Sequence, residues 1–454
     1  MPLIADNRLA LLRGLVKTLP QTALRSLETA LGLTNDQKMV EVRELISSEM
    51  ECRHVKDAVF APYLPMFQDR ADGLEGVQFE RWILDNLWSA LESREPELHA
   101  EARYVLRGLR TEDPTPVVFF RLVNAAAGII RETPELALRR NATDDDREEL
   151  AEFAKYLDLH RLSRQVLSRL YDFMGRIDAD KAAALRVLFK DAAAIDEEGG
   201  YRFLEIIFAN LEDGAQIIKF VATVSDRPKD RFLAESELAD FGTRILDQIE
   251  NSLVSLKAFM GNRNAACNLD EAGDRVALCL AQLQSFGHYI ELAREGPWGK
   301  RVAEAHKIIS ELVETQLKTA ERSVEDVLPF RSERIYGRIK REVPDFTKTL
   351  PAEAVAKARQ TLVFMRKIRN IANAGGFAAL HSKVAQAIEI RLDAYFTELL
   401  ALANGEDPFD TEQLFGLFEL VSDLMQALCG EDKGAVARRR MASSNLFNPS
   451  KSPA

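Results

Sequence analysis

Apolar residues recur at helical spacing along almost the whole chain, and no long stretch alternates between apolar and polar residues as a half-buried strand would. The segment 298–326 shows this pattern most plainly, because its apolar residues form one stripe and its charges lie elsewhere. The stripe consists of Val302, Ala305, Ile309, Leu312, Val313, Leu317 and Ala320. A period of 3.6 residues does not fit the pleat of a strand. We therefore predict an all-α protein with no sheet of more than two short strands.

The chain of 454 residues is long for a single hydrophobic core, so more than one domain is expected. Breakers are closely spaced in the first half, and the polar, proline-containing segment 225–231 is a candidate linker. We predict an N-terminal domain over 1–226, an irregular solenoid-like stack of shorter helices. A C-terminal antiparallel bundle of longer helices is expected over 232–430.

Two of the expected helices bear on later results. One covers 144–174 and begins at Thr143, which is followed by acidic residues in the pattern of a helix cap. The other lies near 331–342 and ends before Pro344. The cap is favoured over a cation site at Thr143, because adjacent aspartates point in different directions.

The composition is that of a soluble globular protein, since 46% of the residues are apolar and 29% are charged, which excludes global disorder. No run approaches the roughly 18 apolar residues of a membrane span. The N-terminus lacks the uninterrupted apolar region of a signal peptide. Four widely separated cysteines without a CxxC pair fit a reducing compartment, so we expect a cytoplasmic protein.

The common catalytic and nucleotide-binding motifs are missing from the sequence. The segment 296–300 (GPWGK) imitates a phosphate-binding loop, but its spacing is wrong and Pro297 lacks an amide hydrogen. We interpret it as a turn between two helices. The sequence therefore predicts no catalytic residue.

Metal-ligand patterns are weak as well. No Glu-x-x-His pair occurs, and the reversed pair His288 and Glu291 is more typical of hydrogen-bonded structure, even with His306 on the next helix. Cys52 and His54 are two residues apart on an expected helix and point to different faces. We predict neither a metal site nor a cofactor.

A basic segment at 331–369 stands out in an acidic chain. It holds eleven Lys/Arg and four Asp/Glu, a net charge of +7, whereas the whole chain carries −11, which leaves −18 elsewhere. On the helix expected near 331–342, four arginines fall within an arc of roughly 80°: Arg331, Arg334, Arg338 and Arg341. Arg366 and Arg369 share a face of the next helix. Guanidinium groups suit carboxylates and phosphates, so these six arginines are predicted to form a face for an anionic partner. The alternatives are a solvated face and a brace to the acidic remainder of the chain.

Three classes of function follow. The favoured one is a helical scaffold or adaptor, regulatory or purely structural, that binds proteins, with the arginine face binding an acidic partner. The second is a regulatory module that binds a phosphorylated ligand or nucleic acid through the same face; few aromatic residues accompany the arginines, which weakens the nucleic-acid case. The third is an enzyme with an unrecognised helical active site. In the tail 441–454, expected to be disordered, Leu446 and Phe447 form a candidate docking motif.

Overall fold

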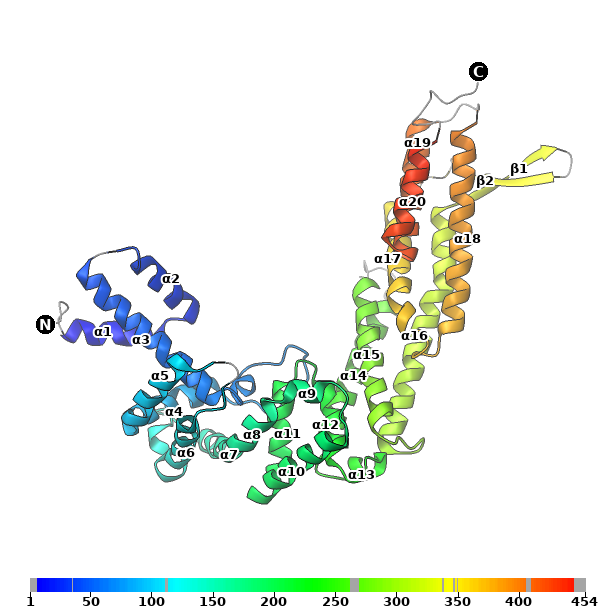
Figure 1. Ribbon diagram of the computed structural model, residues 1–454. Coiled ribbons are helices and arrows are strands. Elements are labelled where there is room, and N and C mark those ends of the chain that lie inside the picture. The colour runs from blue at the N-terminus through cyan, green and yellow to red at the C-terminus, as the bar shows by residue number, and fades with distance from the viewer. Residues whose placement is uncertain are drawn as a thin grey trace. The chain divides into compact units, whose positions relative to one another are not determined.

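The chain forms 20 α-helices and one two-stranded sheet in the residues that the structure describes, which confirms the all-α prediction (Figure 1). The structure is a computed structural model. It describes residues 6–34, 36–110, 113–261, 269–336, 339–345, 348, 350–405 and 410–444. The chain divides into two compact units, residues 1–226 (unit 1) and residues 227–454 (unit 2).

Unit 1 consists of twelve α-helices within its described residues, and most of them pack on helices close in sequence, such as α6 on α7 and α10 on α11. The helices are α1 (Asp6–Thr18), α2 (Gln21–Leu31), α3 (Gln37–Phe60), α4 (Arg81–Arg94), α5 (Pro96–Gly108), α6 (Val117–Glu132), α7 (Asp144–Asp158), α8 (His160–Leu167), α9 (Leu170–Met174), α10 (Ala179–Ile195), α11 (Gly199–Asn210) and α12 (Ile217–Val224).

The single helix predicted over 144–174 is wrong, because the chain forms three helices there, α7, α8 and α9. The first break has a clear cause. The hydroxyl of Tyr63 donates a hydrogen bond of 2.9 Å to the carbonyl oxygen of Tyr156 in the last turn of α7, and Leu159 is buried at the turn that follows. The same carbonyl accepts a hydrogen bond of 3.1 Å from the amide of Leu159, a three-residue spacing typical of a helix end.

The predicted cap at the start of α7 is confirmed. The Thr143 hydroxyl accepts a hydrogen bond of 3.2 Å from the backbone amide of Asp146, and the Asp146 carboxylate accepts one of 2.7 Å from the amide of Thr143. Arg139 also pairs with Asp146, and together these donors lower the pKa of the Asp146 carboxyl to about 2. The acidic start of α7 is thus a reciprocal cap.

His160 is a buried histidine in the aromatic core of unit 1. It is 2% exposed, lies between the rings of Tyr63 and Phe120, and neither of its ring nitrogens has a hydrogen-bond partner among the described residues. Burial and the nearby charge of Arg164 lower the pKa of His160 to about 3. The folded state therefore holds this imidazole neutral.

The low pKa of His160 makes unit 1 sensitive to acid. Below pH 6.5 the unfolded chain binds a proton on this side chain and the folded chain does not, so stability falls as the pH drops from about 6.5 toward 3. Between pH 6.5 and 5.0, His160 should account for a loss of about 2 kcal/mol in the free energy of unfolding. Urea titrations of the wild type and of His160→Phe give the free energy of unfolding at both pH values. The loss between the two pH values should be larger in the wild type by this amount, because His99 and His306 contribute equally to both proteins. Equal losses in the two proteins would contradict the assignment.

Unit 2 is built mainly from longer helices, with the described helix α16 contacting α14, α17 and α18. Its elements are α13 (Asp230–Ala234), α14 (Ala239–Gly261), α15 (Leu269–Tyr289), α16 (Pro297–Val327), β1 (Phe330–Tyr336), β2 (Ile339–Pro344), α17 (Ala352–Ile368), α18 (Ala378–Ala403), α19 (Thr411–Cys429) and α20 (Glu431–Ala442). The apolar stripe predicted for 298–326 is buried except for Leu312, which is half-buried.

Candidate functional site

The basic segment begins with a β-hairpin instead of the predicted helix. Strand β1 pairs with strand β2 in antiparallel orientation, so the helix predicted near 331–342 is wrong. The local sequence explains the strands: β-branched and aromatic residues favour them, and a glycine inside a helix costs about 1 kcal/mol relative to alanine. The residues concerned are Ile335, Tyr336, Gly337, Ile339 and Val343.

The hairpin register gives the backbone positions of the arginines that a helix would have aligned. Arg331 and Arg334 both belong to β1, where Arg331 pairs with Val343 and Arg334 with Lys340. Arg341 of β2 pairs with Glu333 of β1. Arg338 lies outside the described residues. Two paired strands thus replace the helical arc that the prediction assumed, and the binding face itself stays a prediction.

The root of the hairpin is fixed to α18. The ring of Phe330 lies 5.0 Å from the ring of Tyr395, and the guanidinium of Arg391 stacks 5.2 Å from the centre of the Phe330 ring. Val343 is buried on the opposite strand. Beyond this root the two strands extend away from the neighbouring helices in Figure 1. We call residues 330–344 the basic arm, because they carry five basic and two acidic residues, a net charge of +3.

Arg366 and Arg369 do not lie beside the basic arm. Both line a cavity of about 510 Å³ that also includes His381 at the start of α18. Arg366 donates a hydrogen bond of 3.1 Å to the carbonyl oxygen of Gln426, near the end of α19. On α18, His381 and the arm contact Tyr395 are 14 positions apart, a rise of about 21 Å. Whether these two arginines share a partner with the basic arm stays a prediction.

Part of the basic segment pairs with an acidic helix of the same unit. The ammonium group of Lys367 lies 2.8 Å from a carboxylate oxygen of Asp270 and 2.6 Å from one of Asp274, both on α15. These contacts raise the pKa of Lys367. The bracing alternative thus holds for this lysine.

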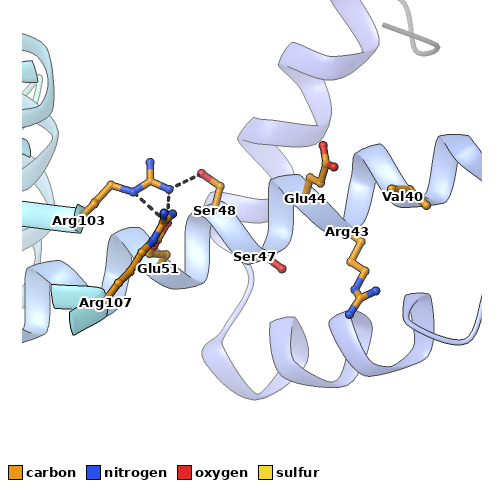
Figure 2. A pocket seen from close by; sticks show the side chains of 8 residues that line it. All are labelled: Val40, Arg43, Glu44, Ser47, Ser48, Glu51, Arg103 and Arg107. Carbon is orange, nitrogen blue, oxygen red and sulfur yellow. Dashed lines mark hydrogen bonds and ion pairs between the residues drawn. The ribbon is translucent and has the colours of Figure 1, made fainter. Parts of the chain in front are cut away.

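A second concave site, of about 570 Å³, lies along α3 and α5 of unit 1. Arg103 and Arg107 both donate to the carboxylate of Glu51, and Arg103 also donates to the hydroxyl of Ser48 over 3.2 Å. The hydrogen bonds from Arg107 and Arg103 lower the pKa of Glu51 to about 2. Figure 2 shows the remaining side chains, such as Arg43, spread along α3 instead of converging on one point. The site has no arrangement suited to acid–base catalysis.

The segment 296–300 forms the turn and helix start that we predicted, and the position where a phosphate would bind is already filled. Asp230 is fully buried, and its carboxylate accepts hydrogen bonds from the backbone amides of Trp298 (3.0 Å), Gly299 (2.9 Å) and Ala293 (3.3 Å). Amides at a helix N-terminus attract anions, and here the anion is an internal side chain.

Two glycines permit this close approach. A Cβ atom on Gly296 would lie 2.0 Å from a carboxylate oxygen of Asp230, and one on Gly299 would lie 2.0 Å from the carbonyl oxygen of Ala293. A larger residue at 296 would displace the Asp230 carboxylate, and one at 299 would require a shift of the backbone. The resemblance to a phosphate loop thus has a structural origin.

Comparison with known proteins adds no family to this description. No family model matches the chain, and neither the curated proteins nor the solved structures compared with it contain a match. Within the described part of the chain, every helix is too short or too polar to cross a membrane. The argument for function therefore rests on the geometry of the chain itself.

The candidate tail motif, Leu446 and Phe447, lies outside the described residues. The described chain ends in α20, which packs on α19 and in which Met441 is 6% exposed. Gly430 joins the two helices with a φ of 99°, a conformation that favours glycine.

Proposed function

We propose that this protein is a cytoplasmic helical scaffold or adaptor that acts through protein–protein contacts, and that the basic arm docks an acidic surface of its partner. The observation that carries the proposal is a hairpin held at its root by Phe330 and Val343, with a net charge of +3 in a chain of −11. A two-stranded hairpin is only marginally stable by itself in water. A partner that contacts the strands would stabilise it.

Charge complementarity fits this role. Arginine side chains bind carboxylates through paired, charge-assisted hydrogen bonds, and Arg331 is exposed at the start of β1. An exposed basic surface speeds the encounter with an acidic partner more than it tightens the final complex. Arg366 and Arg369, which line the cavity beside the start of α18, would contact a different part of the same partner or a second one.

The alternative is a phosphorylated ligand or a nucleic acid bound by the same arm. A two-stranded ribbon can enter the major groove of DNA, and the arm carries five basic residues. The acidic remainder of the chain opposes broad contact with a phosphate backbone, so we rank this alternative second. An enzyme ranks third, because the cavities described above hold ion-paired or widely spaced side chains.

A double charge reversal on the arm tests the proposal. We expect Arg334→Glu with Arg338→Glu to abolish capture of the partner in affinity purification from the native cell, because the arm would then repel an acidic surface. Helicity and melting temperature should stay nearly unchanged, since neither substituted residue belongs to the root at Phe330 and Val343. Mass spectrometry of the captured proteins gives the readout.

The matched control is Lys300→Glu with Lys307→Glu on α16, which changes the net charge equally at two lysines that are each 62% exposed. It should capture the same partners as the wild type. A deletion of 445–454, which spares the buried Met441, tests the tail motif separately. Unchanged capture by the arm variant would contradict the proposal. Wild-type binding to RNA or DNA that weakens steeply as salt rises, and that is lost in the arm variant, would favour the alternative.

A further inference from the structure

Three side chains with metal-binding atoms meet in unit 1, far from the basic segment in sequence. Cys52 comes from α3, Glu92 from α4 and His99 from the first turn of α5. Their ligand atoms all lie within 4.8 Å of one another. The sulfur of Cys52 is 3.6 Å from Nε2 of His99.

The surroundings prepare these atoms for a cation. The indole of Trp88 donates a hydrogen bond of 3.1 Å to the sulfur of Cys52, and its ring lies 4.9 Å from the ring of His99. A donor to the sulfur stabilises negative charge there, as partners around metal-bound thiolates do. Burial lowers the pKa of His99, so the imidazole is neutral and its nitrogen can coordinate.

The distances match one class of ion. A tetrahedral Zn²⁺ with bonds of about 2.3 Å to sulfur and about 2.0 Å to nitrogen holds these two atoms about 3.6 Å apart. The Cys52–His99 pair already has this separation. Glu92 is half-buried and reaches the same place from the end of α4. A rotation of its flexible side chain would bring a carboxylate oxygen to the distance of about 2.0–2.2 Å that Zn²⁺ requires.

We propose that Cys52, Glu92 and His99 form a binding site for a divalent transition metal ion, with Zn²⁺ as the best-fitting ion and water as the fourth ligand. Mixed sulfur, nitrogen and oxygen ligands suit Zn²⁺ and not Mg²⁺ or Ca²⁺. Because burial raises the pKa of the Cys52 thiol, the free protein carries its proton. Metal binding forms the metal–sulfur bond and releases that proton to solvent. The ion would link α3, α4 and α5.

A nearby lysine provides an internal check. The ammonium group of Lys17 lies 3.6 Å from the carboxylate of Glu92, and the Lys17 side chain is exposed. The metal would replace Lys17 as the partner of this carboxylate. Lys17→Gln should therefore bind the ion several-fold more tightly than the wild type, because the competing cation is gone.

Co²⁺ is the probe that distinguishes a metal site from a simple thiol–imidazole hydrogen bond. Titration of the full-length, reduced protein with Co²⁺ should give one equivalent bound, a sulfur-to-cobalt charge-transfer band in the near ultraviolet, and release of one proton. Zn²⁺ should abolish the band. Cys52→Ala should remove it and weaken binding by about 100-fold or more, since even partners around the ligands affect affinity by about 10- to 100-fold.

Two matched controls are available. Cys429→Ser removes another half-buried thiol, and His54→Gln removes an exposed imidazole two residues from Cys52, so both should retain the band. Glu92→Gln, at a half-buried position, should keep the band and weaken binding by about 10-fold. This variant tests the metal site independently if Cys52→Ala fails to fold. A titration without the charge-transfer band, or a band retained in Cys52→Ala, would overturn the proposal.

Discussion

Replacing Asp230 by alanine should lower the free energy of unfolding of unit 2 by about 3–5 kcal/mol, the largest stability effect that we expect from a single substitution. The carboxylate is fully buried and accepts from three backbone amides, those of Ala293, Trp298 and Gly299. Each buried donor left without a partner costs about 1–3 kcal/mol. At about 2–4 °C per kcal/mol, the melting temperature of a unit of this size should fall by about 10 °C.

The measurement is hydrogen exchange, resolved by peptide, which gives opening free energies for α14 and α16 separately from unit 1. Asp230→Asn keeps one carbonyl acceptor and should show about half of the loss. Asp226→Ala, at an exposed aspartate four residues earlier, is the matched control and should have little effect. If the amides of α16 were as well protected from exchange in Asp230→Ala as in the control, the carboxylate would not be the anchor of this helix.

Arg202→Met should destabilise unit 1 by about 2–3 kcal/mol at neutral pH. Arg202 is 2% exposed, and its guanidinium pairs with the carboxylates of Glu152, Asp196 and Glu198. Removing one member of a buried ion-pair network leaves the others without compensation, which costs up to about 3–5 kcal/mol. We expect less than this limit, because the three carboxylates are 36–67% exposed and keep part of their hydration.

The pH dependence of this loss identifies its cause. Burial alone would raise the pKa of Glu152, but the hydrogen bond from Arg202 holds it below its ordinary value. Stability that depends on a lowered carboxyl pKa is present above about pH 4.5 and is lost as the pH falls below it. The difference between wild type and Arg202→Met, read by urea titration, should therefore shrink toward pH 3. Arg169→Met, at an arginine that is 52% exposed, should cost almost nothing at any pH. A loss in Arg202→Met that is independent of pH would indicate lost packing instead.

The helices were predictable where a local pattern decides them. The stripe over 298–326 predicts α16 to within one residue at each end, because a buried face must repeat with the helical period. Thr143 and Asp146 predict the start of α7 through a cap that involves only neighbouring residues. In the hairpin, the spacing of the arginines was misleading, whereas the strand-favouring residues around Gly337 gave the correct signal.

Contacts across the fold could not be predicted in this way. Asp230 belongs to a charged, proline-containing segment that reads as a linker, yet it is fully buried because its partners come from residues more than 60 positions later. Cys52 and His99 are 47 residues apart, and their meeting depends on how α3 packs on α5. The one signal in the sequence was Cys52 itself, and the histidine two residues further on, His54, is not part of the site.

The central claim, that the basic arm docks an acidic partner, is tested most directly by the association rate constant of the captured partner as a function of ionic strength. We predict that the wild-type rate constant falls steeply as salt rises, because exposed charges more than about 8 Å apart are largely screened at 0.15 M. Arg334→Glu with Arg338→Glu should associate at least about 10-fold more slowly at low salt, whereas the Lys300→Glu, Lys307→Glu control should match the wild type. Stopped-flow or biosensor traces give these constants. An arm variant that associates as fast as the wild type at low salt would contradict the account.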